Sequence, residues 1–279
     1  MNAYADRVKP IINEIEILSR RPAYRIVLKE QENTDIFESK LGGVPYWDMK
    51  KSYPCDSKGK KLSLLCQINF DRAALSDARL PQTGMLQFFI LDDDFDYGLD
   101  FKNPDTQDTF RVVYHEHIDQ SVTGDAVLAL GAPTMPSEYS PVLKECALSF
   151  EEYGDTIGMT SFDFDSVFQQ AVKNVTGEET NESIYDYFTD DEYKEIGRSL
   201  MADGHKMLGY PFFTQGDPRE CNGEYEDYYD TLLLQLDSVY CKDRQLMIWG
   251  DSGIANFFIN SRALKELDFS RVLYNWDCY

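Results

Sequence analysis

The sequence lacks any apolar run that approaches the roughly 20 residues needed to cross a bilayer. Its opening residues, MNAYADRVKPIINEIEIL, alternate charged and apolar side chains, whereas a secretory signal needs an uninterrupted apolar segment before its cleavage site. The glycosylation sequons at Asn174 and Asn181 would be used only on a secretory route. These absences predict a soluble cytoplasmic protein that does not enter a membrane.

The sequence also lacks closely paired cysteines. Its six cysteines, at positions 55, 66, 146, 221, 241 and 278, include no C-x-x-C pair. A chain of 279 residues with 43% hydrophobic side chains can bury a core large enough to fold without disulfides. We therefore expect reduced thiols that serve packing, and no metal or other cofactor.

Basic residues are few, because 27 Lys and Arg stand against 49 Asp and Glu, for a formal net charge of -22. A surface of this charge repels phosphate backbones and anionic membranes unless its basic residues are clustered, and the sequence has no such cluster. The composition therefore argues against nucleic acid and membrane partners. It favours a basic protein as the partner.

No motif specifies a reaction. Gly250-Asp251-Ser252-Gly253 resembles the nucleophile loop of serine proteases, but none of the three histidines stands in a motif for the general base. We interpret this tetrapeptide as a turn between strands, in which Asp251 accepts hydrogen bonds from backbone amides. No catalytic residue is assigned from the sequence.

Two patterns resemble parts of metal sites. His115 and His117 lie near a strand end, where residues two apart point the same way and could bind zinc together, but no third ligand accompanies them. The run from Asp92 to Gly98 resembles the start of a calcium loop, but its glycine comes one residue late and position twelve is Asn103. We interpret the first as a surface strand and the second as a solvated hairpin end.

Strand-like patterns dominate the chain and predict an α+β, β-rich fold of antiparallel strands with peripheral helices. Apolar residues between Val8 and Leu18 recur at helical spacing, so a helix of about ten residues after Pro10 should dock on the sheet. The expected strands are Tyr24–Leu28, Leu62–Phe70, Met85–Leu91, Thr109–Tyr114, Cys146–Phe150, Thr231–Leu236, Leu246–Trp249 and Ile254–Ile259.

The segment from Glu151 to Asp203 changes to helical periodicity and carries 14 acidic against 3 basic residues, a net charge of -11. Its apolar residues from 167 to 175 predict one helix, and Thr189 with Glu192 forms a capping box that opens a second. We interpret this segment as an acidic helical connector.

An internal repeat is the most informative feature of the sequence. Three segments of one half match three segments of the other half, in the same order and 166, 168 and 169 residues apart. They predict two related antiparallel β units, about residues 22–115 and 205–279, packed into one core. The matches are KLGGVP (40–45) with KMLGYP (206–211), LCQIN (65–69) with LLQLD (233–237), and Gly84 before FFI (88–90) with Gly253 before FFI (257–259).

These segments, together with LPQTGMLQFF, LGYPFFTQGDP and MIWGDSG, resemble the signatures of the YwqG-like family of bacterial proteins over about residues 20–279. The resemblance implies a β-rich fold with peripheral helices, no assignable catalytic residue and, since some members lie in toxin loci, an immunity-like or accessory role. The implied single domain, 1–279, comprises an N-terminal helix (1–21), a first β unit with following strands (22–150), the acidic connector (151–204) and a second β unit (205–279).

The repeated glutamines define a candidate ligand site. Gln67 shares a strand face with Leu65 and Asn69, and Gln235 repeats this arrangement with Leu233. Either these amides satisfy backbone groups where the two units meet, or they converge on a ligand in a cleft between the units. The cleft candidates are Gln67, Asn69, His205, Lys206, Gln215, Asp217, Gln235, Asp237, Trp249 and Asp251.

Two functions follow from these observations. The first is a soluble cytosolic binding protein, immunity-like or accessory, whose acidic face meets a basic protein partner. The alternative is a small-molecule enzyme with its site in the cleft between the two β units. A bound metal or a pair of perturbed carboxylates in the cleft would favour the enzyme, and an exposed apolar patch beside the connector would favour protein binding.

Overall fold

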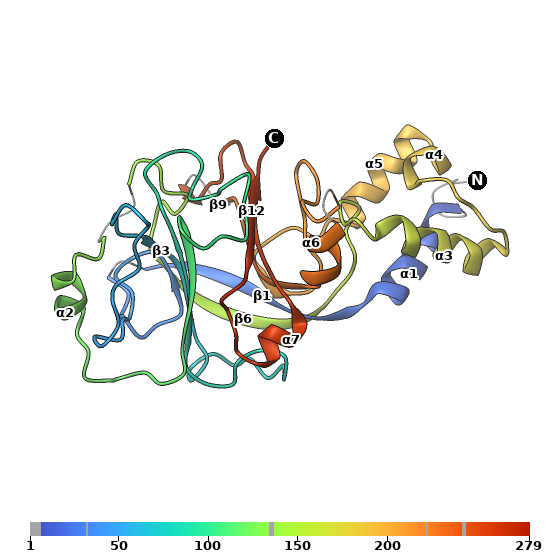
Figure 1. Ribbon diagram of the computed structural model, residues 1–279. Coiled ribbons are helices and arrows are strands. Elements are labelled where there is room, and N and C mark those ends of the chain that lie inside the picture. The colour runs from blue at the N-terminus through green and yellow to red at the C-terminus, as the bar shows by residue number, and fades with distance from the viewer. Residues whose placement is uncertain (1–6, 32, 134–136, 221–222, 242–243) are drawn as a thin grey trace.

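The computed structural model describes residues 7–31, 33–133, 137–220, 223–241 and 244–279 (Figure 1). None of the helices in these ranges is long and apolar enough to span a bilayer. The helices are α1 (Lys9–Ser19), α2 (Gly124–Ala129), α3 (Phe164–Thr176), α4 (Ile184–Tyr187), α5 (Asp190–Ser199), α6 (Gly223–Tyr228) and α7 (Ser261–Lys265). The strands are β1 (Arg21–Glu30), β2 (Lys40–Leu41), β3 (Ser63–Asn69), β4 (Met85–Ile90), β5 (Phe110–His115), β6 (Cys146–Asp155), β7 (Lys206–Leu208), β8 (Thr231–Asp237), β9 (Val239–Cys241), β10 (Arg244–Met247), β11 (Ile254–Ile259) and β12 (Leu273–Asp277).

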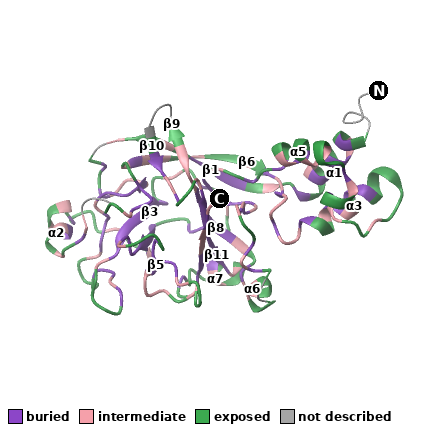
Figure 2. Cartoon of the chain, turned by 90° about the horizontal axis from the view of Figure 1, so that it is seen from above, coloured by how far each residue is buried: buried purple, intermediate pink, exposed green. Residues whose placement is uncertain are grey.

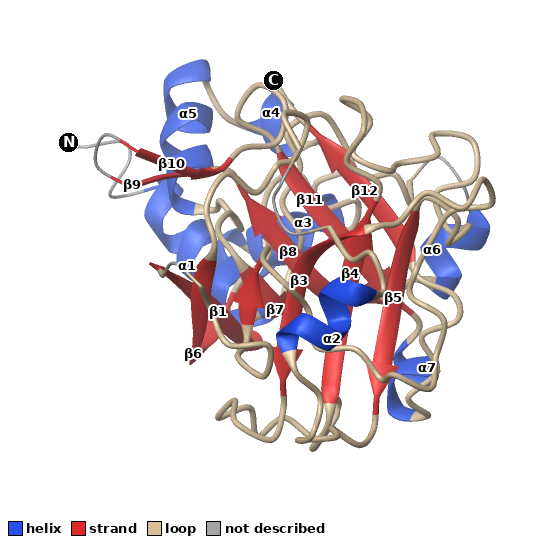
Figure 3. Cartoon of the chain, turned by 90° about the vertical axis from the view of Figure 1, so that its left-hand side faces the viewer, coloured by secondary structure: helices blue, strands red, loops and turns tan. Residues whose placement is uncertain are grey.

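Ten of these strands form one antiparallel sheet in the order β12-β11-β8-β7-β1-β6-β2-β3-β4-β5, and β9 pairs with β10 separately (Figure 3). The long strands β1 and β6 lie at its centre and pair from Arg21 opposite Asp155 to Glu30 opposite Cys146. On their outer sides β1 pairs with β7, and β6 pairs with β2. The prediction of a β-rich antiparallel fold is therefore confirmed.

The sheet curls until its two ends nearly meet, and its inner face encloses the main core. Phe88 of β4 packs against Phe257 of β11 with ring centroids 5.0 Å apart, and Phe110 of β5 packs against Tyr274 of β12 at 5.2 Å. The Tyr274 N–H donates to the C=O of Pro104, so the loop before β5 is also hydrogen-bonded to β12. Aromatic packing thus joins strands from opposite ends of the sheet.

A β-bulge in each half corrects one prediction about side-chain direction. The β3–β4 register shifts between Leu64 and Cys66, and the β11–β8 register shifts where Phe258 pairs with Leu232. The extra residues, Leu65 and Leu233, consequently turn into the main core. Strict alternation predicts that Leu65 and Leu233 share a face with Gln67 and Gln235, and this prediction is wrong.

Helices α1, α3, α4 and α5 form a separate body at one end of the sheet, called here the helical lobe (Figures 1 and 2). Ile11, Ile12 and Ile15 of α1 pack with Phe168 of α3 and Ile196 of α5 in a second apolar core. The prediction that the N-terminal helix docks on the sheet is therefore wrong. Pro10 lies inside α1, in its first turn, where the missing proline N–H breaks no helical hydrogen bond.

The predicted strands all overlap observed strands, and the predicted helices after residue 163 correspond to α3 and α5. The capping box of Thr189 with Glu192 is present at the start of α5. Strand β6 continues to Asp155, so the helical part of the connector starts later than residue 151. The thiols of Cys55, Cys66 and Cys278 are free, and Cys221 lies outside the described residues.

Candidate functional site

The predicted cleft lies where the main core is packed. Phe88 and Phe257 fill the space between the two halves of the sheet. Gln67 and Gln235 lie on the outer faces of β3 and β8, each beneath loops of its own half. The ten predicted cleft residues are therefore divided among several places in the fold.

Gln67 is fully buried and holds a loop on the sheet. Its Nε2 donates to the C=O groups of Ile36 and Glu38, at 2.8 and 2.7 Å. Its Oε1 accepts the N–H of Tyr46 at 3.1 Å and also Nε2 of Gln87 at 3.0 Å. The amide thus supplies partners for buried backbone groups, which is the first of the two roles considered from the sequence.

Gln235 makes matching hydrogen bonds to the backbone in the second half. Its Nε2 donates to the C=O groups of Ala202 and Gly204, both at 2.9 Å, and its Oε1 accepts the N–H of Phe212 at 2.8 Å. Asn256, opposite Gln235 on β11, donates to the C=O of Phe212. Gln87, opposite Gln67 on β4, donates likewise to the C=O of Tyr46.

The strand positions two residues after these glutamines also carry matched contacts. The N–H of Asn69 donates to Oγ of Ser39 at 2.9 Å, and the N–H of Asp237 donates to Nδ1 of His205 at 3.0 Å. Burial lowers the pKa of His205 to about 4 and raises the pKa of Asp237 to about 6. These side chains support the strand edge and do not open to a shared cleft.

Lys206 forms a buried ion pair at the start of β7. Its Nζ lies 3.0 Å from Oδ2 of Asp155, which also accepts the N–H of Tyr210 at 2.8 Å. Burial lowers the pKa of Lys206, and the carboxylate of Asp155 opposes that shift. Because both charges are buried against each other, this pair ties the end of β6 to β7.

Gln215 and Asp217 lie in the loop after β7. The N–H of Gln215 donates to Asp277 at 2.8 Å, and its Nε2 donates to the C=O of Cys278. Asp217 is buried and forms a bidentate ion pair with Arg219, in which Nε lies 2.9 Å from Oδ1 and Nη2 lies 2.6 Å from Oδ2. Both residues fix the course of this loop.

Trp249 and the turn after it lie near the C-terminal strand. The Trp249 ring is fully buried and meets the Tyr97 ring edge-on at 5.5 Å. The predicted turn is present, with Ser252 at φ +60° and its Oγ 3.1 Å from the hydroxyl of Tyr240. Asp251 is exposed, and among the described residues its carboxylate makes no hydrogen bond, so the predicted capping by its side chain is wrong.

The two histidines considered for zinc do not lie together. Strand β5 ends at His115, which is buried, edge-on to the rings of Tyr46 and Trp47, with Nε2 2.9 Å from Oε1 of Gln87. His117 follows the strand and is exposed, so the expectation that both rings point the same way is wrong. No group of three or more His, Cys, Asp or Glu that could hold a metal ion occurs among the described residues.

The acidic run considered for calcium sends its carboxylates to different partners. Asp92 accepts a hydrogen bond from Oγ of Ser63 at 2.8 Å, and Asp93 pairs with Lys60 at 2.7 Å. Asp94 accepts the N–H of Asp96. The run therefore forms no ring of ligands around a common point.

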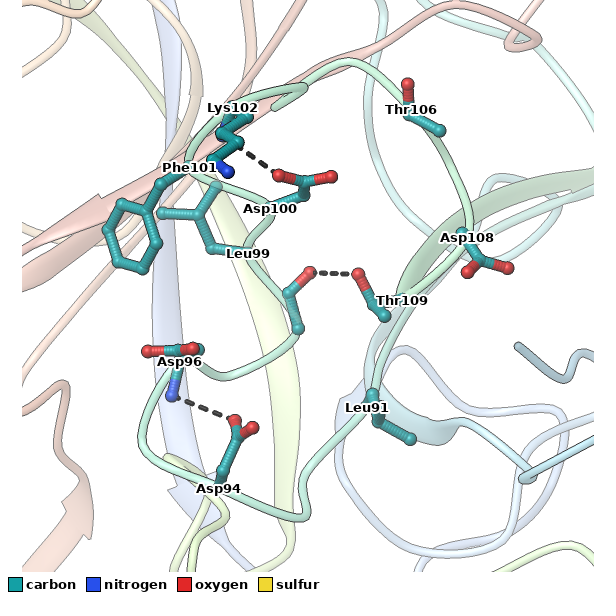
Figure 4. A pocket seen from close by; sticks show the side chains of 11 residues that line it. Leu91, Asp94, Asp96, Leu99, Asp100, Phe101, Lys102, Thr106, Asp108 and Thr109 are labelled. Carbon is teal, nitrogen blue, oxygen red and sulfur yellow. Dashed lines mark hydrogen bonds between the residues drawn. The ribbon is translucent and has the colours of Figure 1, made fainter. Parts of the chain in front are cut away.

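Asp94 and Asp96 line a pocket of about 430 Å³ in the loop between β4 and β5, called here the acidic pocket (Figure 4). Burial and the charge of Asp94 raise the pKa of Asp96. Phe101 lies on this pocket and is 67% exposed. The lining also includes Asp100, Lys102 and Asp108, which lie beyond the acidic run and were not predicted as site residues.

The helical lobe presents a second group of acids, all exposed, at the residues of the predicted connector. Glu179 pairs with Lys173 at 2.7 Å, and Asp186 accepts Oγ of Ser183 at 2.8 Å. No partner among the described residues reaches the remaining four carboxylates. These are Glu178, Glu182, Asp190 and Asp191.

The chain belongs to the family described as Domain of unknown function (DUF1963), whose match covers residues 39–278. This range includes all but the lobe helix α1, strand β1 and the loop that follows it. No curated protein matches the chain.

Proposed function

We propose that this DUF1963 protein is a binding protein that holds a basic protein partner through the exposed carboxylates of its helical lobe. The observation that carries the proposal is the set of four unpaired carboxylates, at Glu178, Glu182, Asp190 and Asp191, on a lobe with its own apolar core. Since those carboxylates take no part in that core, their removal should leave the lobe folded.

The electrostatics favour a partner that comes close. A net charge of -22 attracts cations over a long range, but salt at physiological strength limits this attraction to about 8 Å. Asp190 and Asp191 also lie in the first turn of α5, where negative charge complements the helix dipole. Part of their contribution is therefore to helix stability, and the rest is available to a partner.

The acidic pocket supports the same kind of partner. Asp96 is destabilised as an anion by burial and by Asp94, so a cationic side chain in this pocket would relieve the repulsion between them. Exposed Phe101 beside the pocket offers an aromatic contact to the stem of a lysine or arginine. The pocket is thus a place for one basic side chain of the partner.

The alternative of a small-molecule enzyme between the units draws no support from the packing of Phe88 against Phe257. We extend the proposal, through the resemblance to YwqG-like proteins, to an immunity-like or accessory role in the cytoplasm. This role is tested by producing the protein together with a candidate toxin from a neighbouring locus in one host cell. Survival of that cell would support an immunity-like role.

We also propose that the two β units arose by internal duplication. The support is the matched hydrogen bonding of Gln67 and Gln235, the paired bulges at Leu65 and Leu233, and the packing of Phe88 against Phe257. Strands β2-β3-β4-β5 and β7-β8-β11-β12 follow the same order outward from the central pair.

Binding of a fluorescent oligo-arginine peptide tests the binding surface. The lobe variant carries Glu178→Gln, Glu182→Gln, Asp190→Asn and Asp191→Asn. The matched control removes the same number of exposed acids elsewhere, through Glu116→Gln, Glu220→Gln, Glu226→Gln and Asp227→Asn. We expect the lobe variant to lose about fivefold or more in affinity, and the control much less.

Salt and partner capture complete this test. Affinity of the unchanged protein for the peptide should fall as ionic strength rises, and thermal unfolding should change little in the lobe variant. Basic proteins captured from the native host should be lost with the lobe variant and kept with the control. Equal loss of affinity in both variants would overturn the lobe as the binding surface.

A further inference from the structure

One edge of strand β5 is covered by no other described strand. It is the last strand of the sheet and, within the described residues, pairs with β4 alone. The N–H of Val112 donates to Oε1 of Gln107 at 2.6 Å, so the Val112 backbone points away from β4. Because alternate residues of an antiparallel strand face the same side, the N–H and C=O groups of Phe110 and Tyr114 point outward as well.

A groove of about 500 Å³ runs along this edge. One wall is β5 itself, from Arg111 to Tyr114. The other wall is the segment that leads from α7 into β12, with Leu267, Phe269 and Ser270. The groove is therefore the seam at which the curled sheet does not close.

The side chain of Gln107 spans this seam from one wall to the other. Its Oε1 accepts the Val112 N–H at 2.6 Å, while its Nε2 donates to the C=O of Phe269 at 2.7 Å. A single amide group thus bridges both walls through two short hydrogen bonds. A backbone amide of an extended chain has the same donor and acceptor, so the seam fits one added strand.

Arg111 indicates the charge of the occupant. Its Nε donates to the C=O of Gln107 at 2.9 Å and its Nη2 to the C=O of Cys55 at 3.5 Å, and none of the ion pairs among the described residues includes its guanidinium. In a chain of net charge -22, an arginine without a carboxylate partner on a groove wall matches an acidic side chain of a ligand. A second copy of the chain fits poorly, because two surfaces of the same strong charge repel each other.

We propose that the seam beside β5 binds an extended peptide segment of a partner protein, which adds as a strand to β5 and places one carboxylate against Arg111. Backbone hydrogen bonds to Tyr114 supply part of the affinity. Apolar side chains of the peptide contact Leu267 and Phe269, of which Leu267 is 39% exposed. This site is separate from the helical lobe and does not depend on the function proposed above.

Titration with the labelled peptide acetyl-Thr-Val-Glu-Val-Thr-amide tests the proposal. We expect saturable binding at about 1 mM or below, weakened about tenfold or more by Arg111→Glu. Lys144→Glu, the same change of charge at another exposed position, is the control and should leave binding nearly unchanged. The peptide with Gln in place of Glu should bind as weakly to the unchanged protein as the Glu peptide binds to the Arg111→Glu variant.

Backbone readouts distinguish strand addition from other contacts. The Tyr114 amide should exchange its hydrogen more slowly when the peptide is bound, and a peptide N-methylated at alternate residues should not bind. The proposal is overturned by absence of binding at about 1 mM, or by binding without protection of the Tyr114 amide. Sedimentation as a dimer whose Tyr114 amide is protected without peptide would assign the edge to a second copy instead.

Discussion

Phe88 and Phe257 lie in ring contact, with centroids 5.0 Å apart and planes at 61°, at the centre of the enclosed core. Phe88 belongs to β4 and Phe257 to β11, which are not neighbours in the sheet. The contact therefore depends on curling of the whole sheet. The interaction energy of this pair therefore reports how strongly the two halves of the sheet are coupled.

A double-mutant cycle measures this coupling. Phe88→Leu and Phe257→Leu keep most of the apolar volume but remove the aromatic pair, so each should cost about 1 kcal/mol of unfolding free energy. We expect a coupling of about 0.5 to 1.5 kcal/mol in urea unfolding of the double variant. Phe89→Leu combined with Phe257→Leu is the control and should be additive, because Phe89 lies on the outer face of β4.

Replacing either buried glutamine should destabilise the protein to a similar extent. Gln67→Leu leaves the N–H of Tyr46 and the C=O groups of Ile36 and Glu38 without partners, which should cost about 3 kcal/mol. Gln235→Leu leaves the N–H of Phe212 and the C=O groups of Ala202 and Gly204 without this partner, and it should cost about as much unfolding free energy. Gln120→Leu at an exposed turn should change stability by less than about 0.5 kcal/mol, and a similar loss there would contradict the explanation.

Breaking the buried ion pair should be more costly than breaking an exposed one. Lys206→Met leaves Asp155 buried without its cation and should cost about 3 to 5 kcal/mol in urea unfolding. Adding Asp155→Asn should recover part of that loss, because the amide still accepts the N–H of Tyr210. Lys173→Met, which breaks the exposed pair with Glu179, should cost less than about 1 kcal/mol.

Stability should fall as the pH drops below about 6.5. Burial lowers the pKa of His115 and of His205 to about 4, so in this range the unfolded chain binds more protons than the folded one. Asp237, whose pKa is raised to about 6, acts in the opposite direction, and two histidines outweigh it.

The variant His205→Asn checks this reasoning, because an amide oxygen can replace Nδ1 as acceptor for the Asp237 N–H. Between pH 7 and pH 4.5 it should lose about 2 kcal/mol less than the unchanged protein in urea unfolding. An identical pH profile for both proteins would show that His205 is not among the groups responsible.

The purified protein should hold no stoichiometric zinc or calcium after dialysis. Tight binding needs several deprotonated ligands around one point, whereas His115 bonds to Gln87 and the acids of residues 92–96 take separate partners. Elemental analysis decides the point. One tightly held metal per chain would contradict the prediction.

Local patterns were sufficient to predict the long strands and three lobe helices, α1, α3 and α5. Apolar runs bounded by turn residues marked β3, β4 and β11, and the Thr189–Glu192 capping box marked the start of α5. Strands β2, β7, β9 and β12 were not predicted, and β2 and β7 span only two and three residues before tight turns. Such short strands exist only because longer neighbours pair with them.

The site residues depended on contacts that sequence alone does not specify. The internal repeat placed Gln67 and Gln235 on corresponding strands. The bulges at Leu65 and Leu233 have no recognisable pattern in the sequence. The backbone groups that surround Gln67 come from positions up to 31 residues away in the chain. The acidic pocket likewise forms only when the loop folds back, so that Asp94 and Asp108 line the same pocket.

The central pairing of the sheet also determines what a break in the chain would do. Because β1 pairs with β7, a cut in the exposed segment between α3 and α4 would leave two fragments side by side, one with six strands of the main sheet and one with four. The enclosed core, with Phe88 on one fragment and Phe257 on the other, would hold them together without a covalent link. We therefore expect that the fold can be reconstituted from two separately made polypeptides and that nicking the lobe leaves the sheet assembled.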